Sequence, residues 1–297
     1  MTLIALVGPT AAGKSDLATE LARRLPAEIV NADSMQLYRG MDIGTAKPSL
    51  AERSAVPHHV YDIWDVSEEA SVAAYQRIAL DVVEQIEARG RFPILVGGSG
   101  LYVRAVVDRI EFPGTAPAVR AELERELETL GAPALHQRLS TVDPAAAAAI
   151  LPGNGRRLVR ALEVIRLTGR PFSATLPSYE PRPDIVQIGL DHPALDARID
   201  TRVDRMWAAG LVDEVRALLP LGLRAGRTAS RALGYQQVLA YLAGDCAEDE
   251  ARAATAHATR RFARRQRSWF RRDPRVNWID HQNPIGQTLK LIVSAAT

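Results

Sequence analysis

The sequence predicts an α/β fold with a parallel sheet and an all-helical domain inserted into it, and three observations support this class. Residues 3–7 are short, apolar and branched, as in a buried parallel strand. They run directly into the pattern G-x-x-x-x-G-K-S at residues 8–15, after which apolar residues recur at helical spacing up to residue 25. Residues 113–184 show only helical patterns, whereas strand-like runs precede and follow them.

Residues 8–15 match the P-loop, in which successive backbone N–H groups point at a bound anion. The glycines permit the tight turn, the N-terminus of the following helix adds a partial positive charge, and Lys14 supplies a full one. We therefore predict a P-loop NTPase-like core that binds a diphosphate or a triphosphate. The predicted binding residues are Gly8, Thr10, Ala11, Ala12, Gly13, Lys14 and Ser15.

Composition and charge narrow the class of protein. The 297 residues suffice for one large domain and a smaller one, and the net charge is only +2. No apolar run reaches the ~18 residues that a membrane span needs, and no cleavable leader precedes the first strand. We therefore expect a cytoplasmic protein without membrane contact. Cys246 is the only cysteine, which excludes an intrachain disulfide and a cysteine zinc cluster.

A second strand is expected at residues 28–32, and it delivers Asp33, Ser34, Met35 and Gln36 at its carboxyl end. Ligand sites of parallel sheets gather at the carboxyl ends of the strands, where the P-loop also lies. We therefore expect Asp33 to lie beside the bound phosphates, although a helix cap or a turn is an alternative role for such an aspartate. Residues 37–48 have little periodicity and contain two glycines, which is consistent with an ordered binding loop.

The core is expected to continue with a strand at residues 58–63, an amphipathic helix at 71–89 and a buried strand at 93–96. The two histidines that open the first of these segments lack a third ligand at usable spacing, so a turn or core role is favoured over a metal site. A glycine turn at residues 97–100, with Ser99 inside it, then precedes a helix. This turn could offer a second set of N–H donors to a ligand, or it could be only a tight connection.

The composition shifts at residues 113–117, which contain two prolines and a glycine. From there to about residue 183 the chain is predicted to be helical, with helices at 119–130, 145–150 and 156–168. These features predict an inserted helical domain at residues 113–184, within a core formed by residues 1–112 and 185–297. The basic second half of the insertion could contact a polyanion, or it could be a solvated helix face.

The last third of the chain returns to strand character and then becomes helical. In the helix predicted at residues 194–209, Arg198, Arg202 and Arg205 share one side, and aspartates interleave with them. Ion pairs between residues four apart could account for this pattern alone. The expected elements are a strand at 185–190, helices at 194–209, 211–219 and 230–243, a strand at 276–280 and a helix from about 285.

Residues 259–272 carry the strongest basic signal, because they contain seven arginines and no acidic residue. Arg260, Arg264, Arg267 and Arg271 lie along one side of the predicted helix. A row of guanidinium groups can bind successive phosphates of a nucleic-acid backbone. We therefore favour a nucleic-acid surface over a merely solvated helix face.

Two functional classes fit these features: an enzyme that moves a group between a diphosphate compound and a nucleic acid, or a nucleotide kinase or ATPase. A Walker-type NTPase should carry a second Mg²⁺-binding acid at the end of an apolar strand. The strand predicted at residues 93–96 instead runs into Gly97, Gly98 and Ser99. This difference counts against nucleotide hydrolysis.

Several stretches, taken together, resemble the bacterial tRNA dimethylallyltransferases, also called tRNA isopentenyltransferases of the IPP transferase family. The resemblance covers nearly the whole chain. The stretches that carry it are residues 8–15, 33–38, 40–48, 95–102, 157–164, 234–235 and 260–266.

The resemblance implies transfer of the dimethylallyl group from dimethylallyl diphosphate to N6 of adenosine 37, in tRNAs that read codons beginning with U. It implies Mg²⁺ as cofactor, Asp33 as general base, Ser15 as a catalytic hydroxyl and metal ligand, and Arg202 as a catalytic diphosphate-binding arginine. The P-loop would then hold a prenyl diphosphate. The implied contacts to the tRNA anticodon stem-loop are Asp33, Ser34, Met35, Gln36, Ser99, Arg120, Arg156, Arg157, Leu158, Val159, Arg160, Arg260, Arg264, Gln266 and Arg267.

Many relatives carry threonine where this chain has Ser15 and Ser99; both residue types keep the hydroxyl. Two alternatives to the implied function stay open. One is an enzyme that prenylates free adenine nucleotides, which would have no use for a nucleic-acid surface. The other is a P-loop protein that only senses phosphate compounds on RNA. We expect a monomer, because the surfaces already assigned to RNA leave little room for a subunit interface.

Overall fold

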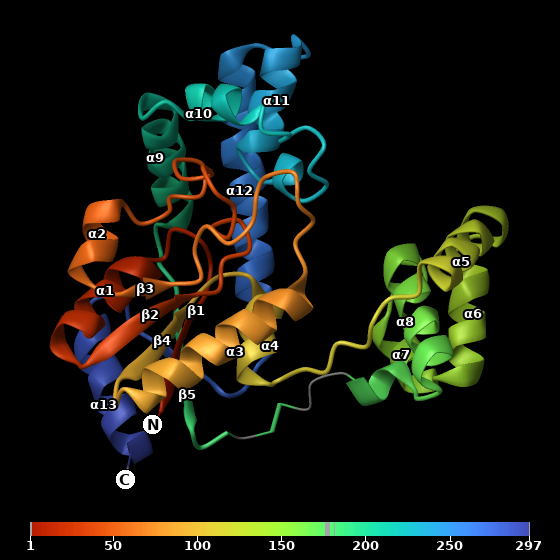
Figure 1. Cartoon of the computed structure of the whole chain (residues 1–297), viewed down its shortest axis with the longest axis horizontal. Coiled ribbons are helices and arrows are strands. Elements are labelled where there is room, and N and C mark those ends of the chain that lie inside the picture. Colours follow the sequence, from red (N-terminus) through yellow and green to blue (C-terminus); the bar gives the residue numbers. More distant parts are fainter. Residues whose placement is uncertain (1, 176–178, 181, 297) are drawn as a thin grey trace. The chain divides into compact units, whose positions relative to one another are not determined.

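The computed structural model describes residues 2–175, 179–180 and 182–296. The chain divides into two compact units (Figure 1). The first consists of Met1–Val107 with Tyr179–Thr297, and the second is Asp108–Ser178. The limits of the second unit lie a few residues before the predicted 113 and 184. Residues 176–178 and 181, which fall within the predicted insertion, lie outside the described part of the chain.

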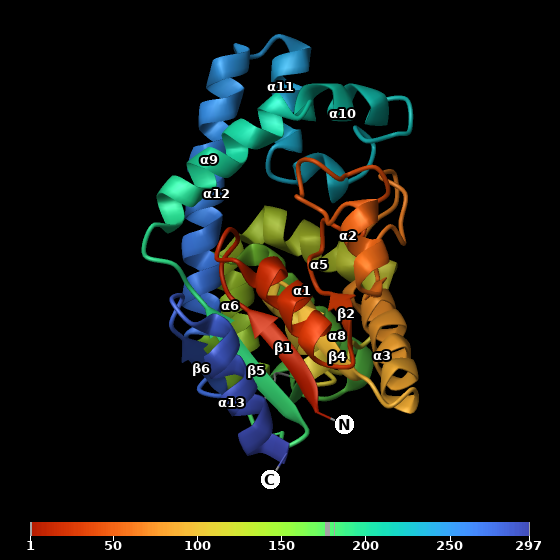
Figure 2. The same cartoon turned by 90° about the vertical axis from the view of Figure 1, so that its left-hand side faces the viewer.

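A six-stranded sheet forms the centre of the first unit, and all of its strand pairs are parallel. The strand that precedes the P-loop, β1, lies between β4 and β5, and Figure 2 shows α1 lying over it. Because the strands are parallel, the loops that follow them meet at one edge of the sheet. The strand order is β3(His58–His59), β2(Ala27–Asn31), β4(Phe92–Val96), β1(Leu3–Val7), β5(Ile185–Leu190), β6(Val276–Ile279).

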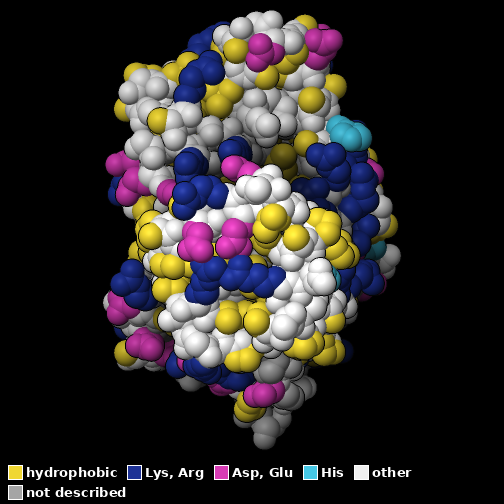
Figure 3. Space-filling model, turned by 90° about the vertical axis from the view of Figure 1, so that its right-hand side faces the viewer, with side chains coloured by type: hydrophobic (Ala, Val, Ile, Leu, Met, Phe, Trp, Pro, Cys, Tyr) yellow, Lys and Arg dark blue, Asp and Glu magenta, His cyan; other side chains and the backbone are white. Residues whose placement is uncertain are grey.

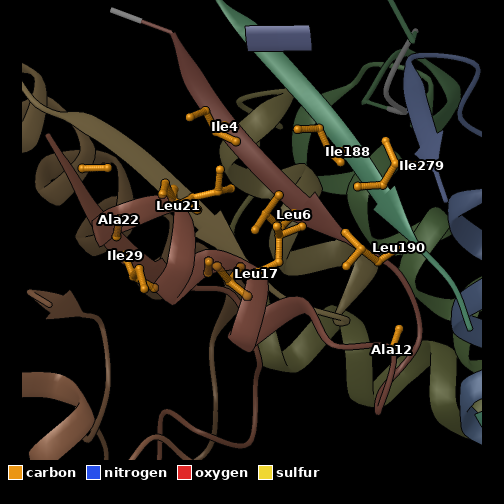
Figure 4. Close-up of a cluster of buried hydrophobic side chains, with 14 of the residues drawn as sticks. Ile4, Leu6, Ala12, Leu17, Leu21, Ala22, Ile29, Ile188, Leu190 and Ile279 are labelled. Atoms are coloured by element: carbon orange, nitrogen blue, oxygen red, sulfur yellow. The ribbon is translucent and has the colours of Figure 1, made fainter. Parts of the chain in front are cut away.

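Side chains of β1 alternate between two apolar clusters, one on each face of the sheet. Ile4 and Leu6 pack with Leu17 and Leu21 of α1, as Figure 4 shows, whereas Leu3, Ala5 and Val7 belong to the opposite cluster. Full burial of one such leucine or isoleucine contributes about 1.5–3 kcal/mol. The strand is buried on both faces, which explains its uninterrupted apolar run.

The described residues of the first unit form ten helical segments in addition to this sheet. A third apolar cluster lies under residues 37–48 and packs Tyr38 and Met41 against α10 and α11. The segments are α1(Lys14–Arg24), α2(Leu50–Ala55), α3(Val72–Ala88), α4(Gly100–Val107), α9(Leu195–Ala208), α10(Leu211–Leu218), η2(Ala229–Arg231), α11(Tyr235–Ala243), α12(Glu248–Phe270) and α13(Pro284–Ala296).

The second unit has its own apolar core, and its described residues contain no strand. Leu123, Leu135, Leu139, Leu158 and Leu162 meet in that core. Its helices are α5(Pro117–Leu130), α6(Ala132–Val142), α7(Pro144–Ala149), α8(Gly155–Thr168) and the short η1(Phe172–Thr175).

Two predicted elements need correction. The strand predicted at 58–63 is confined to β3, because Val60 and Asp62 adopt positive φ angles of 65° and 55°, which end the extended conformation. The helix predicted at 230–243 begins only at Tyr235, after the chain turns at Gly234 with a φ of 87°.

The sequence analysis also missed one helix, α2. Ser49 and Glu52 form a capping box at its start, and this S-x-x-E pattern is visible in the sequence. The basic helix also extends further than predicted, since α12 begins at Glu248. None of the described helices is both long and apolar enough to cross a membrane.

Candidate active site

The P-loop connects β1 to α1 at the carboxyl edge of the sheet. Gly8 has a φ of 132°, and a Cβ atom there would lie 2.1 Å from the carbonyl oxygen of Leu190, so only glycine fits. Lys14 is the first residue of α1, and its Nζ donates a hydrogen bond of 2.7 Å to the carbonyl oxygen of Pro9. The lysine therefore arches back over the loop that it follows.

The pKa of Lys14 is lowered from 10.5 to about 8. Burial is the main cause, the charge of Asp33 opposes it, and the nearby guanidinium of Arg202 adds to it. Burial also lowers the pKa of Arg202, which Asp33 and Asp16 oppose. These mutual effects show that the structure brings Lys14, Asp33 and Arg202 together, although they lie far apart in the sequence. An acid and two cations converge beside the phosphate-binding loop.

Asp33 is held by the polar residue that ends β2. The Oδ1 atom of Asn31 accepts from the Asp33 amide at 2.8 Å, and its Nδ2 donates to the carbonyl oxygen of Val60 at 3.0 Å. The amide of Met35 donates to Asp33 Oδ1 at 2.9 Å. The turn predicted as an alternative role for Asp33 is therefore present, and it fixes the carboxylate at the edge of the sheet.

Buried tyrosines surround this turn. The Tyr75 hydroxyl donates to the carbonyl oxygen of Asn31 at 2.9 Å, and the Tyr75 and Tyr102 rings lie 4.8 Å apart. Burial raises the pKa of Tyr61, Tyr75 and Tyr102, and the negative charge of Asp33 raises each of them further. The sequence analysis did not single out these residues, because they come from a loop and from two different helices.

Helix α9 presents arginines to the P-loop and aspartates to α12. Arg202 donates from Nη1 to Thr10 Oγ1 at 3.3 Å and from Nη2 to the Thr45 carbonyl oxygen at 3.1 Å. One turn earlier, Arg198 Nε donates to the carbonyl oxygen of Ala11 at 2.8 Å. Both guanidinium groups therefore contact the loop or its immediate neighbours. The sequence analysis named Arg202 for the site but left Arg198 out of it.

The aspartates near and on α9 pair with the arginine row of α12. Asp191, just before α9, accepts from Arg267 Nη2 at 2.8 Å and lies 3.4 Å from Arg271 Nη2. The other pairs are Arg264 with Asp196, at 3.8 Å, and Arg260 with Asp200. These pairs between helices take the place of the pairs within α9 that the sequence analysis considered. Part of the charge of the arginine row is therefore already balanced within the protein.

Asp191 is an acid at the end of another strand of the sheet. It follows β5, which pairs with β1 on the side opposite to β4. An acid thus does stand after an apolar strand next to the P-loop strand, although the strand at 93–96 lacks one. Arg267 and Arg271 engage its carboxylate, and Arg267 lowers its pKa.

Gln266 joins the P-loop to the second glycine turn. Its Oε1 accepts from the Thr10 amide at 2.9 Å, and its Nε2 donates to the Gly98 carbonyl oxygen at 2.9 Å. The residue is only 5% exposed. Both polar atoms of its side-chain amide are therefore hydrogen-bonded within the protein. Gln266 lies on the buried face of α12, between Ala263 and Phe270.

The other predicted residues near Asp33 link the same loops. The hydroxyl groups of Ser34 and Ser99 lie 3.1 Å apart, and the Ser34 amide donates to Ser99 Oγ at 3.2 Å. Gln36 is buried, and its Nε2 donates to the carbonyl oxygens of Thr45 and Ala46 at 3.1 and 3.3 Å. Ser99 therefore stands beside the Asp33 turn.

The remaining predicted residues lie in the helical unit. Glu163 is fully buried and binds Arg120 at 2.8 Å and Arg160 at 2.9 Å, so these two arginines are anchored by one carboxylate. Leu158 and Val159 are buried in the core of the unit. Arg156 and Arg157 are exposed at the N-terminus of α8. Figure 3 shows one face of the molecule, on which Lys and Arg side chains gather in bands, with acidic side chains beside some of them.

A metal ion would find few protein ligands here. No group of three or more His, Cys, Asp or Glu side chains in the described part of the chain is arranged to hold one. Mg²⁺ in phosphate sites takes only one or two protein ligands, together with phosphate oxygens and water. Ser15 is exposed and follows Lys14 at the start of α1, so its hydroxyl group could be one such ligand.

The fold and this site place the chain in the class of P-loop α/β proteins. Residues 36–273 match the IPP transferase family, and the chain belongs to that family. A tRNA dimethylallyltransferase from Streptomyces coelicolor is 68% identical over 279 residues, which are 93% of this chain and 89% of the relative. A relative of the same name from Thermobifida fusca is 63% identical over 290 residues, covering 95% of this chain and 91% of its own.

Solved structures agree with this assignment. The full-length tRNA isopentenylpyrophosphate transferase of Bacillus halodurans matches with a TM-score of 0.73 at 42% identity, over 99% of this chain and 96% of that one. A eukaryotic dimethylallyltransferase acting on tRNA matches with a TM-score of 0.82 at 25% identity, over 99% and 78% of the two chains. The P-loop NTPase-like fold predicted from the sequence is confirmed.

Proposed function

We propose that this chain transfers the dimethylallyl group of dimethylallyl diphosphate to N6 of adenosine 37 in tRNAs that read codons beginning with U. The products are N6-isopentenyladenosine and diphosphate. The observation that carries the proposal is the convergence of Asp33, Lys14 and Arg202 beside the P-loop. The names of the relatives support tRNA as acceptor, as does the eukaryotic structural neighbour described as acting on tRNA.

The reaction needs both kinds of charge that the site provides. The bond between C1 of the dimethylallyl group and the diphosphate oxygen breaks, and its electron pair leaves with the diphosphate. Lys14, Arg202 and the P-loop N–H groups stabilise that growing negative charge. The adenine N6 forms the new bond to C1, and Asp33 takes the proton that N6 releases.

Mg²⁺ is the proposed cofactor, and Ser15 is the residue that would hold it. When bound, the ion would neutralise charge on the departing diphosphate. Asp33, whose Oδ1 accepts from the Met35 amide, is assigned to the proton of adenine N6.

The tRNA contacts are proposed on two surfaces. One is the exposed side of α12 with the turn at Ser34 and Ser99, next to the site of transfer. The other is the basic start of α8 in the helical unit. Because the target base is normally stacked in the anticodon loop, it must leave the stack to reach Asp33. We propose that the enzyme works as a monomer in the cytoplasm, where tRNA is found.

A direct assay separates the candidate functions. The protein is incubated with dimethylallyl diphosphate, Mg²⁺ and either an anticodon stem-loop or AMP, and the nucleosides are then analysed. Isopentenyladenosine in the stem-loop alone is the expected result. Product from AMP at a comparable rate would favour the free-nucleotide alternative. Product from neither acceptor, with RNA still bound, would favour a phosphate-sensing role.

We expect the affinity for dimethylallyl diphosphate to fall as the pH rises through about 8. Burial lowers the pKa of Lys14 to about 8, so above this value the free enzyme holds a neutral lysine and must take up a proton to bind the anion fully. Binding is strongest below pH 8 and weakens by about tenfold per pH unit above it. Calorimetric titration with an unreactive phosphonate analogue between pH 7 and 9.5 measures this slope.

Lys14→Arg is the matched control, because an arginine stays charged over this range. The affinity of Lys14→Arg for the phosphonate analogue should change little with pH, apart from any titration of the analogue itself. A wild-type profile as flat as that of the arginine variant would show that Lys14 does not titrate at the anion site.

We expect Arg264→Gln to weaken binding of an anticodon stem-loop and to reduce its salt dependence. Arg264 is exposed and only loosely paired with Asp196, at 3.8 Å, so its guanidinium is available to a phosphate. Losing one phosphate contact should lower the slope of log Kd against log salt by about 1. Arg252→Gln, near the other end of α12, is the control and should leave the slope unchanged. An unaltered slope for Arg264→Gln would remove this residue from the RNA surface.

A further inference from the structure

The segment 40–48, here called the 40–48 loop, is neither helix nor strand and yet is firmly built into the protein. Met41 is fully buried, and Thr45 and Lys47 are almost so. Lys47 Nζ lies 2.6 Å from carboxylate oxygens of both Asp42 and Asp62. The loop therefore has one defined conformation despite its lack of regular structure.

This loop supports the diphosphate-binding arginine directly. The carbonyl oxygen of Thr45 accepts a hydrogen bond of 3.1 Å from Arg202 Nη2, while Nη1 of the same guanidinium reaches Thr10 Oγ1 at 3.3 Å. A guanidinium is planar and its donors have a fixed geometry, so two acceptors on different loops set its orientation. The position of Thr45 thus helps to decide where Arg202 points.

Glu214 of α10 holds the backbone of the loop. Its carboxylate accepts from the amides of Asp42, Ile43 and Gly44 at 3.0, 2.7 and 3.2 Å. It also accepts from the Tyr235 hydroxyl at 2.5 Å. Three consecutive N–H groups and a phenol therefore converge on one carboxylate, which lies about 170 residues away from the loop in the sequence.

The tyrosine stays a donor in this arrangement. Tyr235 is fully buried, and burial together with the charge of Glu214 raises the pKa of its hydroxyl well above 10. The phenol therefore keeps its proton at physiological pH and can donate the fourth hydrogen bond to Glu214. Because the Glu214 carboxylate already accepts from these four donors, we assign it a structural role and not that of a proton acceptor for substrate.

We propose that Glu214 is a positioning residue for dimethylallyl transfer, acting by fixing the 40–48 loop so that Thr45 orients Arg202 against the P-loop. This inference rests on the proposed role of Arg202 at the diphosphate. A displacement of about 1 Å at a reacting group can cost about 10²-fold in rate. An anchor that sets the place of Arg202 can therefore influence catalysis without touching substrate.

The test is a steady-state comparison of Glu214→Ala and the milder Tyr235→Phe with wild type. For Glu214→Ala we expect kcat to fall about 10–100-fold and the KM for dimethylallyl diphosphate to rise, while the Kd for the stem-loop stays within about twofold. Tyr235→Phe keeps the ring and removes one donor, so it should shift the same constants by a few-fold. It remains informative if the alanine variant does not fold.

Glu28→Gln is the matched control for a purely structural loss. Glu28 is also a buried carboxylate, and it binds Arg89 and His59 near the start of β2, away from the carboxyl ends of the strands. The Glu28→Gln variant should have a lower melting temperature than wild type and an unchanged ratio of kcat to KM. If Glu214→Ala and Tyr235→Phe resemble this control, the positioning role is wrong.

A double-mutant cycle with Arg202→Gln separates this inference from the proposed function. If Glu214 acts through Arg202, adding Glu214→Ala to Arg202→Gln should cost less than about twofold more activity. Full multiplication of the two losses would overturn the positioning role but leave Arg202 in place. Wild-type activity of Arg202→Gln alone would instead refute the proposed role of Arg202.

Discussion

Asp33→Asn is expected to lower the rate of dimethylallyl transfer by about 10²–10⁴-fold, the usual contribution of a general base. The asparagine keeps the shape of the side chain and can still accept from the Met35 amide, but it cannot take the proton from adenine N6. Single-turnover rates with saturating stem-loop measure the loss, and filter binding measures the RNA affinity, which should stay nearly unchanged.

Asp65→Asn is the control for this substitution, because Asp65 is an exposed aspartate that pairs with Arg39 on the surface. It should be as active as wild type. If Asp33→Asn lost RNA binding together with activity, Asp33 would be a structural part of the turn that Asn31 supports, and the base would have to be sought elsewhere.

Arg202→Gln is expected to reduce kcat by about 10²–10³-fold, as for the loss of one preorganised donor to a developing anion. The guanidinium lies between Thr10 and Thr45, so its removal leaves the growing charge of the diphosphate with Lys14 and the loop amides alone. The matched control is Arg205→Gln, an exposed residue one turn further along the same helix, and its activity should stay within about twofold of wild type.

Binding measurements show whether Arg202→Gln acts at the diphosphate site. A variant that fails to hold the diphosphate should also bind the phosphonate analogue more weakly, whereas its affinity for the stem-loop should persist. Equal losses in the Arg202 and Arg205 variants would mean that α9 contributes general positive charge rather than a specific contact.

Local patterns were enough to predict the phosphate loop and most of the core. The P-loop sits between a strand and a helix that each show their own periodicity, and the position of Asp33 follows from the rule for carboxyl ends of parallel strands. The strand predicted at 58–63 failed for a local reason that periodicity does not reveal. The positive φ angles of Val60 and Asp62 accompany the ion pairs that Asp62 makes with Lys47 and Arg53.

Partner choice between distant segments was not predictable from the sequence. The aspartates of α9 could pair within their helix, and only the packing of α9 against α12 decides that Arg260 and Arg264 receive them. Glu214 looked like any acid in the first turn of a helix, since nothing in its neighbourhood points to a loop far away. Gln266 entered the predicted tRNA contacts only through the family resemblance, and nothing in the sequence around it indicates that its amide joins two distant loops.

The contacts of Gln266 connect the proposed RNA surface to the P-loop. One helix carries both the arginines proposed for RNA and the amide that joins Thr10 to Gly98. An RNA that shifts α12 would also shift the Gln266 amide, and with it the hydrogen bond to Thr10 of the P-loop. Because such coupling is reciprocal, whatever factor tRNA imposes on the affinity for the prenyl diphosphate, the diphosphate imposes on the affinity for tRNA. Any effect of the two ligands on each other is therefore equal in both directions, and the contacts of Gln266 offer one route for it.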